Sequence, residues 1–102
     1  VVGWISLSPY GKGREGLRRT VEISYYVHKE HQRQGVGTAM MRVILSRAKE
    51  LGYANIIAIL FETNEGSIRL LEKFGFERWG LMPGIIEVEG KAFGHLYCGL
   101  KI

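Results

Sequence analysis

Apolar and polar residues alternate along several short segments of the chain, and this two-residue period predicts β-strands. In the segment 20–27, Val21, Ile23, Tyr25 and Val27 fall on one face, and Glu22, Ser24 and Tyr26 fall on the other. A continuous apolar run over 55–61 is typical of a strand buried on both faces. Further strands are expected at 1–7, 77–82 and 92–100, with a turn at Pro83 and Gly84 between the last two.

Two segments show the three- and four-residue spacing of amphipathic helices. The first begins at Gly35 and ends at Gly52, and its expected apolar stripe consists of Met40, Val43, Ile44, Ala48 and Leu51. The second is expected to have Asn64 as N-cap, to turn Ile68, Leu71 and Phe74 inward, and to end at Gly75. The order β-β-α-β-α-β-β predicts an α/β fold. Its mixed central sheet would begin with an antiparallel hairpin, and the crossover helices would join parallel strands that are neighbours in the sheet and would pack on it.

The composition is that of one small domain. Of the 102 residues, 46% are hydrophobic, and no apolar run is long enough to span a bilayer. The net charge of +4 suits a polyanion, either nucleic acid or a phosphate-bearing cofactor, although an ordinary basic surface explains it equally well. Cys98 is the only cysteine, which excludes an internal disulfide and favours the cytoplasm. His28 and His31 lack further ligands, so we expect no metal.

Two glycine-rich stretches have the composition of phosphate-binding turns, but their surroundings differ. Residues 11–16 match G-x-G-x-x-G, yet a strand-like segment follows where a dinucleotide-binding turn requires a helix, so we interpret them as a hairpin loop. Residues 32–38 follow a strand and lead directly into the first helix. Glycines there let a ligand approach the backbone, the unpaired N–H groups of the first turn attract anions, and Arg33 adds positive charge. A turn that merely starts a helix is the alternative.

The second stretch resembles motif A of the GNAT superfamily of N-acetyltransferases, Q/R-x-x-G-x-G/A, with Gln32, Gly35 and Gly37 in the matching places. The second helix is similar to the N-x-x-S segment of that family, through Asn64 and Ser67, and it ends in the same G-F pair. The resemblance covers nearly the whole chain. In that family a strand and two helices precede the part seen here. We therefore expect a missing N-terminal part, with residues 1–102 forming the C-terminal, acetyl-CoA-binding portion of a GNAT acetyltransferase domain.

Within the superfamily, the sequence T-V-E-I-S-Y-Y-V at 20–27 and K-A-F-G at 91–94 are similar to the phosphinothricin and L-amino-acid N-acetyltransferase branch. This resemblance implies an enzyme that transfers an acetyl group from acetyl-CoA to the amine of a small amino-acid-like acceptor. Members of the branch are commonly dimers, and an apolar first strand would otherwise expose a sheet edge, so we expect a homodimer. Only the basic charge favours nucleic acid, and we expect neither a nucleic-acid nor a membrane partner.

The resemblance also assigns roles to individual residues. Backbone amides of the motif would bind the CoA pyrophosphate, a role that falls on Gln34, Gly35, Val36, Gly37 and Thr38, with Arg33 assisting. Tyr26 and Val27 would pair with the pantetheine arm, and a backbone N–H there would stabilise the thioester oxyanion. Asn64 and Ser67 would lie beside the pantetheine and the thioester, which makes Asn64 a candidate for catalysis as well as for cofactor binding. Their alternative roles are N-cap and first-turn residue.

Proton transfer needs a further group. The acceptor amine is mostly protonated at neutral pH and must lose a proton before it attacks the thioester. Glu22 is the candidate general base, because the branch carries its catalytic glutamate in T-V-E; its alternative role is an ordinary solvent-facing strand residue. Leu71 stands where the family places a Tyr or His and cannot donate a proton. This departure leaves open a degenerate module that binds CoA or a partner without turnover. Cys98, where the branch often has Asp, leaves the acceptor open.

Overall fold

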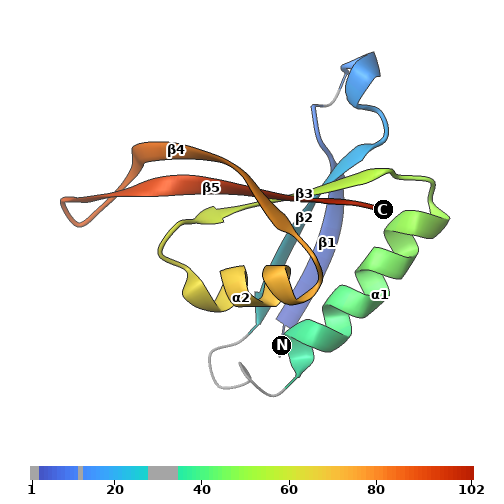
Figure 1. The fold of residues 1–102 in the computed structure, drawn as a ribbon, viewed down its shortest axis with the longest axis horizontal. Helices are drawn as coiled ribbons and strands as arrows, with labels where there is room; N and C mark the ends of the chain where they lie inside the picture. The colour runs from blue at the N-terminus through green and yellow to red at the C-terminus, as the bar shows by residue number, and fades with distance from the viewer. Residues whose placement is uncertain (1–2, 12, 28–34) are drawn as a thin grey trace.

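The structure is a computed structural model that describes residues 3–11, 13–27 and 35–102 (Figure 1). Its strands are β1 (Gly3–Pro9), β2 (Thr20–Val27), β3 (Asn55–Phe61), β4 (Glu77–Val88) and β5 (Lys91–Lys101). Its helices are α1 (Val36–Glu50), α2 (Glu65–Lys73) and a short 3-10 helix, Glu15–Leu17. The predicted order of strands and helices is confirmed.

The strands form one sheet in the order β1-β2-β3-β5-β4, in which β2 and β3 are parallel and the other neighbours are antiparallel. The predicted mixed sheet and the antiparallel first pair are therefore confirmed. The prediction of parallel neighbours is confirmed for β2 and β3, which α1 joins, but is wrong for β3 and β4, which α2 joins, because β5 pairs between them. The described residues of 11–16 lie in the connection from β1 to β2. This connection contains a 3-10 helix of three residues, Glu15–Leu17, and a strand follows it. This confirms their interpretation as a hairpin loop.

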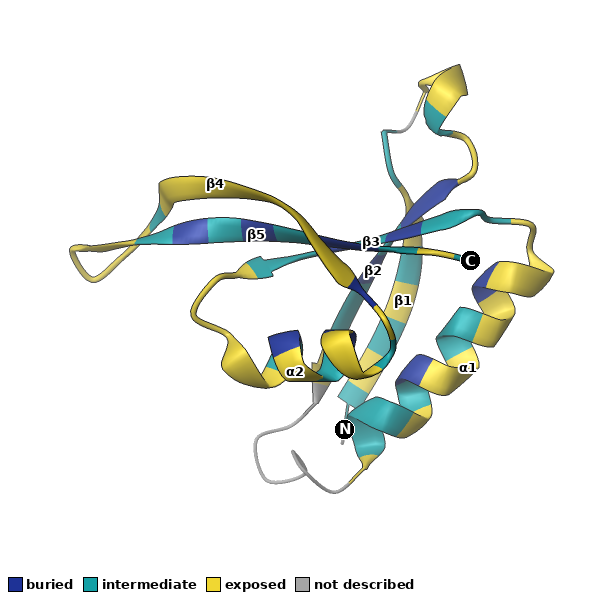
Figure 2. Cartoon of the chain, in the orientation of Figure 1, coloured by how far each residue is buried: buried dark blue, intermediate teal, exposed yellow. Residues whose placement is uncertain are grey.

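Both helices pack on one face of the sheet and share a single core with it. The buried apolar side chains are Val21, Ile23, Ile56, Ala58, Leu96 and Cys98 of the strands, Met41 and Ala48 of α1, Ile68 and Leu71 of α2, and Phe76. The intervening residues of β2, which are Glu22, Ser24 and Tyr26, are only half-buried or exposed. Figure 2 shows the buried positions on the strands and on the sides of the helices that face them. The predicted alternation of β2 is thus confirmed as far as Tyr26; the side chain of Val27 lies outside the described residues.

The predicted apolar stripe of α1 is partly wrong. Met41 is fully buried where the prediction had Met40, and Val43 and Leu51 are 69% and 54% exposed. Ile44 and Ala48 do contact the core or belong to it. Apolar residues lie around more than one side of this helix, so several stripes satisfy a period of 3.6 residues. The facing strands select the stripe that is buried.

The predicted turn at Pro83 and Gly84 is also wrong. Strand β4 continues through both residues to Val88, and the chain reverses at Glu89 and Gly90, which both have positive φ as a two-residue hairpin turn requires. Proline is tolerated in β4 because this strand lies at the edge of the sheet and its pairing with β5 is irregular between Met82 and Ile86.

The identity of the buried stripe on α1 can be tested by paired truncations. Met41→Ala should lower the free energy of unfolding by about 2–5 kcal/mol, because it leaves a cavity in the core. Val43→Ala, two residues away on the exposed side, should change it by less than about 0.5 kcal/mol. Urea denaturation followed by circular dichroism measures both. Equal losses from the two variants would contradict the described orientation of α1.

Candidate functional site

The parallel strands β2 and β3 pair over only four residues and then separate. Their register runs from Thr20 opposite Asn55 to Ile23 opposite Ala58, whereas β2 stays paired with β1 as far as Val27. Figure 1 shows the two strands diverging toward the starts of α1 and α2. Backbone groups of β2 after Ile23 are therefore not engaged with β3, and an extended ligand can pair with them.

A cavity of about 320 Å³ lies between the separating strands, and we call it the sheet cavity. Its lining comes from β2 and β3 together with Trp4 and three residues at or in α2, namely Asn64, Ser67 and Leu71. Residues of both sheet faces contribute, since Tyr25 lies on the helix-covered face and Ser24 on the other. A group held in this cavity can therefore be approached from the face that neither α1 nor α2 covers.

A second cavity, which we call the helix cavity, lies where the two helices begin and has a volume of about 700 Å³. Gly35, Gly37 and Thr38 line it from α1, and residues 64–67, 69 and 70 line it from α2. Tyr25, Asn64 and Ser67 line both cavities. These three side chains mark the junction of the two cavities, so one elongated ligand can occupy both.

The start of α1 is built to receive an anion. Gly35 is the N-cap, with φ of 81°, and provides no side-chain oxygen for the first N–H groups of the helix. The first turn of α1 contains no acidic residue, whereas α2 has Glu65 in its first turn. Apart from Gly35 itself and its two chain neighbours, no described residue has an atom within 4 Å of the place that a Cβ would take at Gly35. The helix N-terminus therefore presents unpaired N–H groups and positive dipole charge to the helix cavity.

Lys73 adds a positive charge beside this helix start. Its Nζ donates a hydrogen bond of 3.3 Å to Thr38 Oγ1, in the first turn of α1. Lys73 was not among the candidates from the sequence, because it lies 35 positions from Thr38 and only the packing of α2 beside α1 brings the two together.

Asn64 is the N-cap of α2, as predicted: its Oδ1 accepts a hydrogen bond of 3.2 Å from the backbone N–H of Ser67. The same contact sets both side chains at the junction of the cavities. Asn64 therefore combines a structural role with a position in the candidate site, and its capping bond holds Ser67 next to it.

Glu22 lines neither cavity. It lies half-buried on β2, on the face opposite the helices, in register with Ser8 of β1 and Ile57 of β3. On the same face, two residues further along β2, Ser24 lines the sheet cavity. Residues two apart on a strand are separated by about 7 Å, so Glu22 stands next to the open side of the sheet cavity.

The other predicted site residues fall into three groups. Tyr26, Gly35, Gly37 and Thr38 line the helix cavity, and Asn64 and Ser67 line both cavities. Val36 begins α1 but is not among the lining residues of either cavity. Arg33 and Gln34 lie outside the described residues, and so does the side chain of Val27.

Tyr25 is a site residue that we did not single out from the sequence. Its ring packs against the core, and it lies at the junction of the two cavities. Burial raises the pKa of its phenol above the usual value, a hydrogen bond with the Ser67 side chain opposes this shift, and Cys98 adds to it. The alternation of β2 did place Tyr25 on the inward face, but the strand pattern alone gives no sign that a cavity opens beside it.

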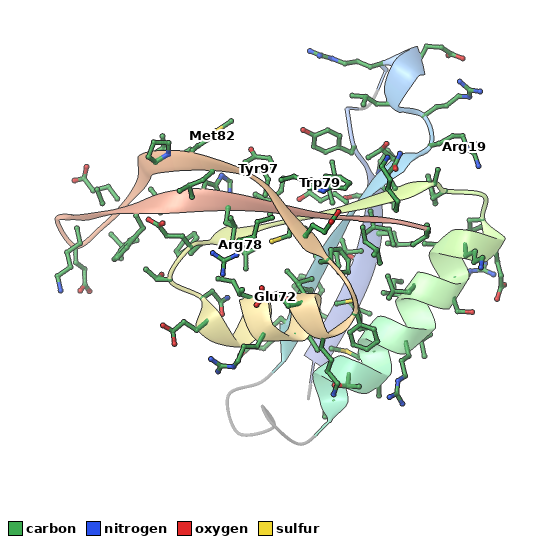
Figure 3. The ribbon with its side chains drawn as sticks, viewed as in Figure 1. Arg19, Glu72, Arg78, Trp79, Met82 and Tyr97 are labelled. Atoms are coloured by element: carbon green, nitrogen blue, oxygen red, sulfur yellow. The ribbon has the colours of Figure 1, made fainter. Side chains whose placement is uncertain are left out.

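Cys98 is a buried core residue, as expected. Burial raises the pKa of its thiol, nearby Arg78 opposes the shift, and Glu72 adds to it. In Figure 3, Arg78 lies on the side of β4 that faces α2, whereas Trp79 lies on the other side. A thiol with a raised pKa is mostly protonated at neutral pH, and Cys98 is therefore a poor nucleophile.

Two further features are absent from the described residues. No group of three or more His, Cys, Asp or Glu side chains within them is arranged to hold a metal ion. Among the helices of this part of the chain, none is long and apolar enough to cross a membrane.

Comparison with known proteins gives matches over most of the chain. The sequence profile described as the acetyltransferase (GNAT) family matches residues 1–76. A Bacillus subtilis protein, provisionally named a phosphinothricin acetyltransferase, is 38% identical over 93 residues, which is 91% of this chain and 56% of that protein. An L-methionine sulfoximine/L-methionine sulfone acetyltransferase of Pseudomonas aeruginosa is 35% identical over 96 residues, covering 92% of this chain and 52% of its own.

Solved structures share the fold. A GNAT superfamily phosphinothricin acetyltransferase from Sinorhizobium meliloti, in complex with acetyl-CoA, superposes with a TM-score of 0.91 at 27% identity. That match covers 99% of this chain and 54% of the other. The chain thus spans about half the length of the relatives that it matches.

Proposed function

Because the chain belongs to the acetyltransferase (GNAT) family, we propose that it takes part in N-acetyl transfer from acetyl-CoA to the amine of a small amino-acid-like acceptor. We propose further that residues 1–102 form the C-terminal, acetyl-CoA-binding portion of the acetyltransferase domain, and that the cytoplasm is its location. The observation that carries the proposal is that the two cavities share three lining residues, Tyr25, Asn64 and Ser67. These residues lie between the start of α1, which suits an anion, and the gap in the sheet.

The two ends of the site suit the two ends of acetyl-CoA. The pyrophosphate would bind the N–H groups of Gly35, Val36, Gly37 and Thr38, where helix dipole and Lys73 charge are both positive. The pantetheine arm would pass the junction and pair with the backbone of β2 at Tyr26 and Val27, as an added strand does. The absence of β2–β3 pairing after Ile23 supports this. Arg33 and Gln34 would complete the phosphate contacts.

The acetyl group would then lie in the sheet cavity, open to the face that carries Glu22. An acceptor arriving from that face meets Glu22 before it reaches the thioester, so we assign Glu22 the role of general base, directly or through one water. A backbone N–H of β2 would stabilise the oxyanion, and Asn64 and Ser67 would contact the pantetheine beside the thioester. Several relatives are named for amino acids or amino-acid analogues, which supports an acceptor of that class.

The phosphate cradle can be tested with two glycines at opposite ends of α1. Gly35→Val should weaken CoA binding at least about tenfold, because the side chain enters the space in which the phosphate lies. Gly52→Val is the matched control: Gly52 also has positive φ, of 88°, and open surroundings, but it follows the end of the helix. Backbone strain is thus similar in both variants. Isothermal titration calorimetry on the folded proteins measures their CoA affinity, and a loss that occurs only in Gly35→Val is due to ligand contact and not to strain. Equal CoA affinity for Gly35→Val and the parent would exclude the cradle.

Catalysis can be tested by measuring thiol release from acetyl-CoA with a panel of amino acids and amino-acid analogues. We expect turnover with free α-amines of this class. Glu22→Gln should lower kcat by about 10²–10⁴-fold and leave CoA affinity nearly unchanged, and the deficit should shrink as pH rises and more amine is deprotonated. Parental kcat for Glu22→Gln at pH 7 would remove Glu22 from the mechanism. CoA binding without release from any amine would favour the degenerate module.

We also propose a homodimer, and the edge strand β4 supports it better than β1 does. Its exposed apolar side chains are Trp79, Leu81, Met82, Ile85 and Val88. Figure 2 shows β4 exposed along most of its length, and Figure 3 shows Trp79 and Met82 on it. Light scattering at micromolar concentration should give twice 11.5 kDa for the parent and for Val43→Arg on α1, but 11.5 kDa for Ile85→Arg. A parent mass of 11.5 kDa would contradict the dimer.

A further inference from the structure

Among the described residues that line the sheet cavity, Tyr25 is the one with an ionisable side chain. Its ring is held by the core, which fixes the direction of the side chain, and the residue also lines the helix cavity. An extended molecule that occupies both cavities must therefore pass the Tyr25 side chain. If its phosphate end is at the start of α1, its other end lies beyond Tyr25, in the sheet cavity.

Ser67 lies next to Tyr25, since both residues line both cavities. The Ser67 side chain lowers the pKa of the Tyr25 phenol, against the larger effect of burial, which raises it. A neighbouring group that lowers the pKa of a phenol stabilises the phenolate. Ser67 can therefore compensate part of the negative charge that remains on Tyr25 once the proton has left.

Transfer of an acyl group from a thioester to an amine expels a thiolate. A proton donor that is a much stronger acid than an aliphatic hydroxyl assists this step. Tyrosine, whose ordinary pKa is about 10 against about 8.5 for a thiol, is such a donor, and burial raises the pKa of Tyr25 above that ordinary value. The other hydroxyl groups that the described part of the chain contributes to this lining are those of Ser24 and Ser67, which are far weaker acids. Leu71, also in the lining, is fully buried and has no proton to give.

We propose that Tyr25 is a catalytic residue that protonates the sulfur of CoA as the thioester is cleaved. This inference rests on the proposed function. The amine nitrogen forms a bond to the carbonyl carbon, the carbon–sulfur bond breaks, and its electron pair goes to sulfur, which takes the Tyr25 proton. The nitrogen loses one proton to Glu22 or water, and the phenolate, held by Ser67, recovers a proton from solvent. The products are the amide and the CoA thiol, and no redox change occurs.

Turnover tests the inference first. Tyr25→Phe keeps the ring in the core and removes only the hydroxyl, so kcat should fall by about 10²-fold while the affinity for acetyl-CoA stays near the parental value. Tyr53→Phe is the matched control, since Tyr53 also packs against the core but lines neither cavity. It should keep the parental kcat. Thermal unfolding by circular dichroism establishes that all three proteins are folded.

A second measurement needs no turnover. CoA labelled with ¹³C at the methylene next to sulfur reports the ionisation of its thiol by NMR as pH is varied. A phenol that points at the sulfur stabilises the bound thiolate, so the pKa of the bound thiol should be about one unit lower with the parent than with Tyr25→Phe. Tyr53→Phe should match the parent. This difference is a property of contact with sulfur, which a merely structural role of the Tyr25 hydroxyl would not produce.

The outcomes separate the two proposals. Parental kcat together with a parental thiol pKa in Tyr25→Phe would overturn the role of Tyr25 and leave the acetyltransferase intact. If the parent binds CoA but releases no thiol with any amine, the proposed function fails, and the NMR titration alone decides whether Tyr25 contacts the sulfur. If calorimetry finds no CoA binding to the parent, both proposals are rejected.

Discussion

The short pairing of β2 and β3 is the constraint on which the candidate site depends. Two parallel strands that stayed in register to their ends would close the sheet and bury their backbone groups in each other. Here β1 pairs with β2 from Val21 to Val27 and β5 pairs with all of β3, so the two can separate after Ile23 and Ala58 without either strand being lost. The gap is thus maintained by the strands that flank the pair.

Topology then brings the helix starts to the same end of the sheet. α1 follows β2 in the chain and α2 follows β3, and because the strands are parallel both helices begin beyond the same, carboxyl end of the pair. Crevices at this end of parallel strands are the usual ligand sites of α/β proteins. In this chain the N-cap of α1 is Gly35, which has no side-chain oxygen, whereas the N-cap of α2 is Asn64, which accepts a hydrogen bond from the Ser67 N–H. The start of α1 therefore attracts anions, while the start of α2 fixes the positions of the Asn64 and Ser67 side chains.

The core sets the precision of this geometry. Leu71 and Ile68 hold α2 against the strands, and Met41 and Ala48 hold α1, so the positions of Asn64, Ser67 and the first turn of α1 follow from buried apolar contacts. Tyr25 takes part in both the core and the candidate site: its ring packs against the core, and its phenol interacts with the Ser67 side chain. The opposite face of the sheet, with Glu22, has no such cover from α1 or α2. Two ligands can therefore reach the gap between β2 and β3 from different sides of the sheet.

The local pattern was sufficient for the elements, their order, the alternation of β2 and the N-cap at Asn64, because strand period, helix period and capping depend on near neighbours in sequence. The glycines of motif A likewise predicted the helix start that lines the helix cavity. Other features are decided by contacts between distant residues. The buried side of α1 depends on the strands that it faces, and Pro83 stays within β4 because that strand lies at a sheet edge. The meeting of Lys73 with Thr38 and of Tyr25 with Ser67 depends on how α2 packs, and only the tertiary structure determines such long-range packing.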